Sequence, residues 1–245
     1  MDHREKQKVA LITGCSSSGV GHQTALALNN KGFHVVAAGA VRDELLDLRD
    51  KGCEIIELDV ADEKHRVRAV QIAEEHHGAV DVLVNNPGGA EFGSIVEFPL
   101  DAIKWQFETS VFGVIRMSQL VLPAMRRQRS GRIINISSAP VDADHRGVSI
   151  HYATRQAIEA IDAGLRVEVE DFGIHVIGIQ PGDADTEERE IARTIVEAAN
   201  DDDPAARYYV SMFPKRSFAL NRATSASVWD AAMRIKRPGE RPKHH

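Results

Sequence analysis

The sequence predicts a single α/β domain in which helices cover both faces of a doubly wound, parallel β-sheet. Short apolar runs alternate with amphipathic helical patterns along the chain, which is the order of elements in this architecture. The first run, Val9–Ile12, contains no polar residue, as expected for a strand buried on both faces. Glycines also close the first two helical segments, at Gly32 and Gly52.

The first half of the chain contains four predicted strands with helices between them. In the first helix, Ala25, Leu26 and Leu28 form an apolar face that is expected to lie against the sheet. The strands are predicted at Val9–Ile12, Phe33–Ala38, Glu54–Leu58 and Val80–Val84, and the helices at Gln23–Lys31, Asp43–Lys51 and Glu63–His77.

Two long helices dominate the second half of the chain. Apolar residues recur at helical spacing through Asp101–Met125, and a second long helix is predicted at Tyr152–Asp171. The other elements are strands at Arg132–Ile136 and Ile174–Ile179, a helix at Thr186–Asn200 and an edge strand at Arg207–Ser211. One domain is expected to span 1–245, with loose ends at 1–7 and 236–245.

Composition argues against several classes of function. The net charge of −6 and the pI near 6.0 disfavour a general nucleic-acid binder. The densest basic run, Arg126–Arg129, falls where a helix should end, and there cations suit the helix dipole. Cys15 and Cys53 fit neither a zinc motif nor a disulfide framework, so we expect no metal and a cytoplasmic location. The chain shows no signal peptide before Val9 and no membrane-spanning run.

The stretch Lys8–Gly21, KVALITGCSSSGVG, is the strongest local signal for function. A buried strand leads into Thr13-Gly14, and Gly19-Val20-Gly21 leads into a helix. Glycines allow a tight turn and close approach of a pyrophosphate, and the helix N-terminus favours the anion. A purely structural turn with three glycines is the alternative interpretation.

Several further landmarks occur in an order and at a spacing that resemble the short-chain dehydrogenase/reductase family. They are the glycine turn Thr13–Gly21, Asp59-Val60, the run Asn85-Asn86-Pro87-Gly88, the strand and serines of Arg132–Ser138, Tyr152, and Pro181-Gly182 with Thr186. Together they cover residues 8 to about 186. The resemblance implies a Rossmann-type fold. The longer glycine turn and Phe107–Gly113 look most like a branch that acts on lipid-like and steroid-like carbonyls with NADP(H).

The resemblance also implies a catalytic set, which this chain keeps only in part. Tyr152 would exchange a proton with the substrate oxygen, and Ser138 would hydrogen-bond the same oxygen. The family's Lys, four residues after its Tyr, is Gln156 here, and its helix Asn is Ser110. The spacing from Ser138 to Tyr152 is one residue longer than usual, and Pro87 replaces the usual alanine.

The loss of the lysine charge is expected to weaken the site. A cation about 4 Å from a phenolate contributes about 4 kcal/mol at an effective dielectric constant near 20. Gln156 carries no such charge, so Tyr152 should be a poor base at neutral pH. Arg155 is the obvious substitute, but it lies about 100° around an ideal helix from the usual position. His151 adjoins Tyr152 but faces another way, so neither residue is assigned a catalytic role.

A nicotinamide cofactor is implied, with NADP(H) favoured over NAD(H). The second strand ends without the acid that binds the NAD ribose, and Arg42 can reach a 2′-phosphate. Alternatively, Arg42 and Asp43 simply start the next helix, with Asp43 as its N-cap. The cofactor-binding residues implied by the resemblance are Gly14, Ser16, Ser17, Gly19, Val20, Gly21, Arg42, Asp59, Val60, Asn85, Asn86, Gly88, Gln156, Pro181, Gly182 and Thr186.

Two hypotheses for function follow. The first is an NAD(P)(H)-dependent oxidoreductase acting on a hydrophobic alcohol or carbonyl, impaired by Gln156 and Ser110. The second is a non-redox or inactive relative, such as a binding subunit or a cyclase-type or dehydratase-type enzyme. By resemblance, helices 101–125 and 152–171 would form a homodimer or homotetramer interface, and residues 183–214 would cover the substrate. No metal, nucleic-acid or membrane partner is expected.

Overall fold

A computed structural model describes residues 7–89, 92–137, 147–181 and 186–210, which all belong to one compact domain. The first half of the domain contains β1 (Val9–Ile12), α1 (Gly19–Asn30), β2 (His34–Gly39), η1 (Arg42–Leu45), α2 (Leu46–Asp50), β3 (Glu54–Glu57), α3 (Glu63–His77) and β4 (Val82–Asn85). The second half contains α4 (Leu100–Phe107), η2 (Glu108–Phe112), α5 (Gly113–Gln128), β5 (Gly131–Ile136), α6 (Ser149–Val169), η3 (Glu170–Phe172), β6 (Ile174–Pro181), α7 (Glu188–Asn200) and β7 (Arg207–Val210).

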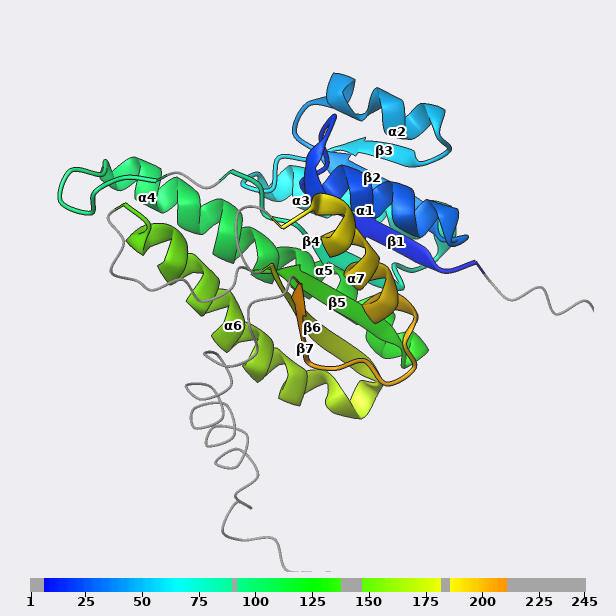
Figure 1. Cartoon of the computed structure of the whole chain (residues 1–245). Helices are drawn as coiled ribbons and strands as arrows, with labels where there is room; N and C mark the ends of the chain where they lie inside the picture. The colour runs from blue at the N-terminus through cyan, green and yellow to red at the C-terminus, as the bar shows by residue number, and fades with distance from the viewer. Residues whose placement is uncertain (1–6, 90–91, 138–146, 182–185, 211–245) are drawn as a thin grey trace, which may run out of the picture. The chain divides into compact units, whose positions relative to one another are not determined.

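The strands form one parallel sheet in the order β3-β2-β1-β4-β5-β6-β7 (Figure 1). The chain first builds outward from β1 to β3 and then returns to start β4 on the other side of β1. This reversal confirms the doubly wound prediction and places the switch point at the carboxyl ends of β1 and β4. Ligands of open α/β sheets bind at such a switch point.

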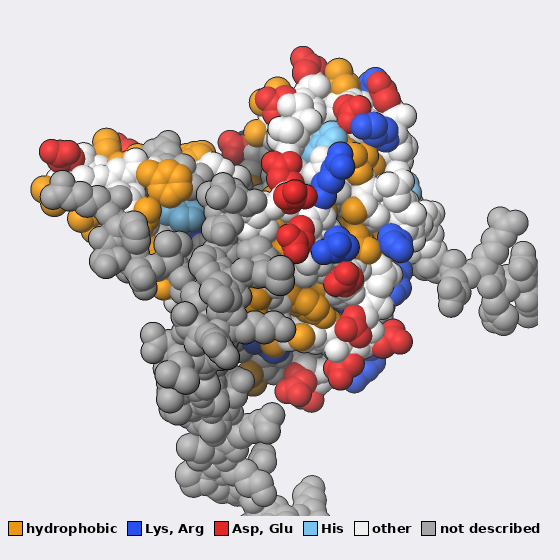
Figure 2. Space-filling view, in the orientation of Figure 1, with side chains coloured by type: hydrophobic (Ala, Val, Ile, Leu, Met, Phe, Trp, Pro, Cys, Tyr) orange, Lys and Arg blue, Asp and Glu red, His pale blue; other side chains and the backbone are white. Residues whose placement is uncertain are grey.

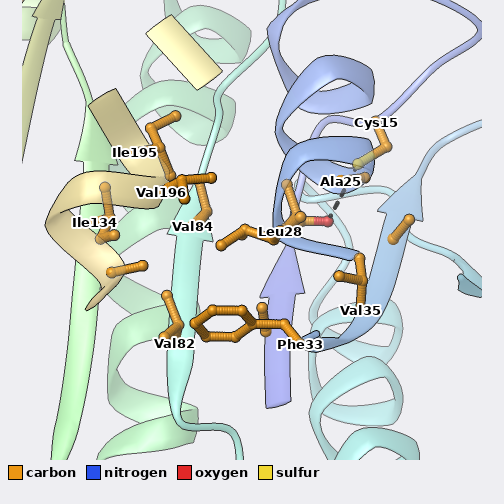
Figure 3. Close-up of a cluster of buried hydrophobic side chains, with 14 of the residues drawn as sticks. Cys15, Ala25, Leu28, Phe33, Val35, Val82, Val84, Ile134, Ile195 and Val196 are labelled. Carbon is orange, nitrogen blue, oxygen red and sulfur yellow. Dashed lines mark hydrogen bonds between the residues drawn. The ribbon is translucent and has the colours of Figure 1, made fainter. Parts of the chain in front are cut away.

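The two faces of the sheet pack into two separate apolar clusters. Along β1, Ala10 and Ile12 belong to the cluster covered by α1 and α7, whereas Val9 and Leu11 belong to the opposite one. Figure 3 shows the first cluster, in which Leu28 of α1 meets side chains from the central strands. All four β1 residues are at most 2% exposed, as the apolar run predicts. Leu26, also expected on this face, is only partly buried.

The helix predicted over 101–125 is present as a continuous helical segment, and it contains one π turn that was not predicted. The segment is α4, then the π-helical turn η2, then α5. A single π turn of this kind occurs inside α-helices without ending them. Two helices also begin earlier than predicted, α1 at Gly19 and α6 at Ser149.

The surface over α1, α2 and α7 carries acidic and basic side chains that are interspersed (Figure 2). No helix among the described residues is long and apolar enough to cross a membrane. Cys15 and Cys53 are buried free thiols, and burial raises the pKa of Cys15 to about 12 and that of Cys53 to about 11. Of the expected loose ends, 1–7 and 236–245, all but Gln7 lie outside the described residues, and so do residues 183–185 and 211–214 of the expected substrate cover.

Candidate active site

The glycine turn after β1 is fixed against the end of β4. The backbone N–H of Asn86 donates to Thr13 Oγ1 at 3.1 Å, and Asn86 Nδ2 donates to the carbonyl of Gly14 at 2.9 Å. Gly14 has φ +66°, and a Cβ at this position would lie 2.0 Å from the Asn86 carbonyl oxygen. Only glycine therefore permits this approach, and the turn sits at the switch point of the sheet.

The helix that follows the turn begins without a cap. Gly19, at φ +88°, is its first residue, and the Ser18 side chain makes no capping hydrogen bond to the described chain. The first turn of α1 also carries no acidic residue. In α3, by contrast, Asp62 accepts from two backbone N–H groups of the first turn. The N–H groups at the start of α1 are thus available to an anion.

The other residues of the turn differ in how they can meet a ligand. Ser17 is exposed, while Ser16 is half-buried and donates from Oγ to the carbonyl of Ser18 at 2.8 Å. Val20 packs against the core. A side chain at Gly21 would clash with the glycine turn, because its Cβ would lie 2.7 Å from the Gly14 carbonyl oxygen.

The residues predicted to contact the adenosine part lie at the ends of β2 and β3. Arg42 is exposed and begins η1, so Asp43 lies inside the first turn and is not the cap. Asp59 is exposed just beyond β3, where its Oδ1 accepts from the N–H of Ala61 at 2.9 Å. Val60 packs beside Gly113.

Asn85, the last residue of β4, and Asn86, the residue after it, both make contacts within the protein. Asn85 is 1% exposed and donates to Asn135 Oδ1 at 2.8 Å, while Asn86 clamps the glycine turn. Gly88 is exposed, with nothing within 4 Å of the position of a Cβ. Of the remaining predicted residues, Pro181 ends β6, Thr186 is half-buried before α7, and Gly182 and Ser138 lie outside the described residues.

Ser110 lies in the π turn η2 and is fully buried, and its Oγ accepts from Gln106 Nε2 at 3.2 Å. Single π turns inside helices occur frequently at functional sites. The serine therefore occupies a locally widened turn of the helix, but it carries no amide group.

One stripe of α6 faces the sheet, and it is not the stripe that carries Tyr152. Arg155, Ile158 and Asp162 are 7%, 1% and 4% exposed, and they recur at the spacing of one helical face. His151 lies one turn before Arg155 on the same stripe. Tyr152 and Gln156 lie one residue further around the helix and are half-buried.

Arg155 places its guanidinium at the carboxyl ends of β4 and β5. Nη1 donates to the carbonyl of Ile136 at 3.1 Å and Nη2 to that of Pro87 at 3.5 Å. Its Nε is buried and has no hydrogen-bond partner in the described part of the chain. Burial lowers the pKa of Arg155 to about 10, so the side chain keeps its positive charge at neutral pH.

His151 lies one turn further toward the carboxyl edge of the sheet. Its ring is 5.5 Å from that of Phe92, and its Nδ1 is buried without a partner among the described residues. Burial and the charge of Arg155 lower the pKa of His151 to about 4. The imidazole is therefore neutral at pH 7.

A buried polar chain continues the same stripe away from the site. Asn85 donates to Asn135, and Asn135 Nδ2 donates to Asp162 Oδ1. This chain links β4, β5 and α6 through the core. Burial raises the pKa of Asp162 to about 7, although the hydrogen bond from Asn135 opposes the shift.

Comparison with known proteins agrees with this architecture. Residues 8–195 match the model of the short chain dehydrogenase family. The chain belongs to that family. An oxidoreductase of Bacillus subtilis strain 168, YusZ, is 34% identical over 72% of this chain, and the match spans 65% of YusZ. The chain thus covers less than two thirds of this curated relative.

Solved structures of other short-chain dehydrogenases share the fold. One from Streptomyces avermitilis is 27% identical and superposes with a TM-score of 0.82, covering 95% of this chain and 100% of the other. A metagenomic short-chain oxidoreductase in complex with NADP is 21% identical, with a TM-score of 0.75 over 84% of this chain and 98% of the other. At that identity the likeness concerns the fold alone.

The sequence analysis of this short-chain dehydrogenase assigns no catalytic role to His151 or Arg155, yet the structure places both at the carboxyl edge of the sheet. A signal for them was present. His151 lies one residue closer to Ser138 than Tyr152 does, which is the spacing that the family resemblance implies. Arg155 follows His151 by four residues, the interval that places two side chains on one helical face.

Proposed function

We propose that the protein is an NAD(P)(H)-dependent oxidoreductase acting on an alcohol or carbonyl substrate. The observation that carries the proposal is the anion-binding arrangement at the switch point, which consists of the glycine turn after β1 and the start of α1. We call it the cradle. Gly14 lets the turn approach Asn86, and the uncapped start of α1 at Gly19 offers backbone N–H groups to a pyrophosphate. The residues present fit a dinucleotide, because the glycine turn packs closely on Asn86 and leaves the uncapped start of α1 at the switch point.

NADP(H) is the cofactor we propose in preference to NAD(H). Arg42 is exposed just beyond β2, and no acid stands between the end of that strand and Arg42. A cation at this place pairs with the 2′-phosphate of NADP, whereas an acid accepts from the 2′-hydroxyl of NAD.

Arg155 is proposed to supply the positive charge that Gln156 lacks. When bound, a nicotinamide dinucleotide exchanges a hydride with the carbon of the substrate's carbonyl or alcohol group. The substrate oxygen gains negative charge as the carbonyl is reduced, and it takes up a proton to become a hydroxyl. A buried guanidinium close to that oxygen stabilises the developing charge more strongly than an exposed one does.

The proton-exchanging group is proposed to lie near the start of α6. Sequence alone proposes Tyr152 with Ser138, whereas the contacts favour His151, because it shares the sheet-facing stripe with Arg155. A neutral imidazole can relay a proton: during reduction one ring nitrogen gives its proton to the substrate oxygen while the other ring nitrogen takes a proton from water, and the same transfers run in reverse during oxidation. Tyr152 is the second candidate for this role.

The substrate is proposed to be hydrophobic. Large apolar side chains are exposed in the segment after β4, among them Phe92, Ile95 and Val96, and Phe92 packs against His151. Exposed apolar clusters of this kind mark binding surfaces. The proposal that residues 183–214 cover the substrate rests on the family resemblance.

The protein is also proposed to form a homo-oligomer and to be located in the cytoplasm. A groove of about 480 Å³ runs between α5 and α6 and is lined by Val114, Ile115, Leu122, Ile161, Gly164 and Leu165, among others. We propose that a second copy of the chain covers it. The cytoplasmic location is supported by two cysteines that are both free thiols.

A non-redox or inactive relative is the second candidate function. It is favoured by the half-buried, uncharged Gln156 and by Ser110, whose hydroxyl is occupied by Gln106. In that case the cradle binds a nucleotide or another anion without hydride transfer.

Titration with NADPH and NADH, followed by calorimetry, tests the proposal. We expect micromolar binding of NADPH and weaker binding of NADH, followed by turnover on a panel of hydrophobic carbonyls. If NADPH binds without turnover, the non-redox candidate replaces the oxidoreductase. If neither dinucleotide binds at millimolar concentration, both the cofactor proposal and the oxidoreductase proposal fail.

A further inference from the structure

Three histidines surround one carboxylate at the edge of the sheet opposite the active site. His34 and Glu54 are the first residues of β2 and β3, and His76 and His77 are the last two of α3. These are the amino ends of the strands, whereas the glycine turn lies at the carboxyl ends. The cluster is therefore separate from the site described above.

The atoms of this cluster are close enough to share one ion. Glu54 Oε2 lies 2.9 Å from His77 Nε2 and 3.5 Å from His34 Nε2. The three ligand atoms of His34, Glu54 and His77 all lie within 4.8 Å of one another. In a tetrahedral zinc site with bonds near 2.0 Å, neighbouring ligand atoms are separated by about 3.3 Å. The observed spacing needs only small shifts to meet this value.

Burial makes the cluster more than a chance surface contact. The side chains of His34, Glu54 and His77 are 32%, 23% and 20% exposed. The rings of His34 and His77 are 3.7 Å apart, so each restricts the other. His34 Nε2 is buried, and its contact with Glu54 Oε2 at 3.5 Å is too long for a good hydrogen bond. A buried nitrogen that is weakly hydrogen-bonded and directed at a carboxylate is the arrangement that a cation would satisfy.

His76 supports the arrangement from the other side of the carboxylate. Its Nδ1 lies 2.8 Å from Glu54 Oε1, so it holds the oxygen that does not face His34 and His77. This contact orients the carboxylate toward His34 and His77, and hydrogen bonds of this kind orient metal ligands.

We propose that His34, Glu54 and His77 form a binding site for a divalent transition-metal ion, zinc by preference. Two imidazoles and one carboxylate suit zinc better than magnesium or calcium, which take oxygen ligands. A fourth position is left for water. Because the ligands come from β2, β3 and α3, the ion joins three elements and has a structural role. This proposal does not depend on the proposed oxidoreductase activity.

The competing explanation is a set of proton-mediated pairs between Glu54 and its histidines. Histidines in the last turn of α3 also suit the helix dipole, so the cluster can exist without a metal. The two explanations differ in one measurable respect. A metal site binds one ion per chain and depends on His34 and His77 together, whereas ion pairs bind none.

The test is a titration of the chelator-treated, full-length chain with ZnCl₂ at pH 7.5, followed by calorimetry. All variants are made in a His244→Ala/His245→Ala background, because the terminal histidines can bind zinc themselves. We expect one zinc ion per chain with a micromolar or lower Kd. His77→Gln and Glu54→Gln should each weaken binding at least about 100-fold, and His76→Gln about tenfold. His65→Gln, on the same helix but outside the cluster, is the matched control and should bind like the background.

A second measurement separates loss of ligand from loss of fold. Bound Co²⁺ should give the visible absorption of a tetrahedral site with nitrogen ligands, and this band should vanish in His77→Gln while the metal-free Tm stays unchanged. Absence of stoichiometric zinc binding in the background chain overturns the proposal. Equal binding by the background and the His34→Gln/His77→Gln double variant overturns it as well.

Discussion

Arg155 donates from Nη1 to the carbonyl of Ile136, the last residue of β5, and so brings a buried positive charge to the carboxyl edge of the sheet. The sequence places an uncharged Gln156 where the resemblance calls for a lysine. The contact with Ile136 shows that the neighbouring residue delivers a cation to the same edge.

Replacement of Arg155 should remove this charge. We expect Arg155→Met to lower kcat about 10²-fold to 10³-fold, a range typical for loss of one group that stabilises developing charge. Arg155→Lys should retain more activity. If Arg155 supplies the cation, Gln156→Lys should give no gain in rate, because Gln156 is off the sheet-facing stripe. A large gain in Gln156→Lys would instead show that the site lacks a cation.

Substitutions at His151 and Tyr152 should identify the proton-exchanging group. We expect His151→Gln to lower kcat about 10²-fold to 10⁴-fold, as loss of general acid–base catalysis does. Tyr152→Phe removes only one hydroxyl and serves as the matched comparison. Steady-state rates at saturating NADPH give both values. The opposite ranking would assign the role to Tyr152.

Gly14→Ala should weaken dinucleotide binding. The added Cβ would lie 2.0 Å from the Asn86 carbonyl oxygen, so the turn must move. We expect NADPH affinity to fall more than about tenfold, or about 1.4 kcal/mol. Gly32→Ala is the control, since Gly32 also has a positive φ but nothing within 4 Å of the position of a Cβ. Equal affinities in the two variants would contradict the placement of the cofactor.

Asp162→Asn should change how stability depends on pH. The raised pKa of Asp162, about 7, means that the folded chain holds this proton between about pH 4 and pH 7 while the unfolded chain releases it. Its contribution to stability is therefore complete below about pH 4 and is lost as pH rises to about 7.

Asparagine keeps the oxygen that accepts from Asn135 but cannot ionise, so the loss should be absent in the variant. At about 1.4 kcal/mol for each tenfold change in proton affinity, the effect is at most about 4 kcal/mol. Urea denaturation of both proteins across pH 4 to 8 measures it, and parallel curves would exclude an ionising Asp162.

Gly164→Arg should convert the proposed oligomer into a monomer. Gly164 lines the groove between α5 and α6, and no atom lies within 4 Å of the position of a Cβ there. The substitution therefore leaves the single chain intact and also favours the helix by about 1 kcal/mol. Light scattering at micromolar concentration should show a dimer or tetramer before the change and a monomer after it. A wild-type monomer would refute the oligomer.

The sheet could be predicted from the sequence because its central strands are apolar runs closed by glycine or polar residues. The glycine turn was equally accessible, since its residues act through their own backbone. The sequence did not show in the same way which residues of α6 face the sheet. Which of His151 and Tyr152 points to the sheet depends on packing against β5, and one residue of offset turns a helix by about 100°. The π turn at Ser110 was not predicted either, because an amphipathic helical pattern does not show which turn takes an extra residue.

Cys15 lies inside the cofactor turn, yet its thiol is buried and donates to the carbonyl of Ile12. Burial keeps it in the unreactive thiol form at neutral pH. Alkylating reagents should therefore reach Cys15 only when the turn between β1 and α1 opens. The alkylation rate of Cys15 therefore measures how often this turn opens. A bound ligand that holds the turn closed should lower that rate in proportion to its occupancy.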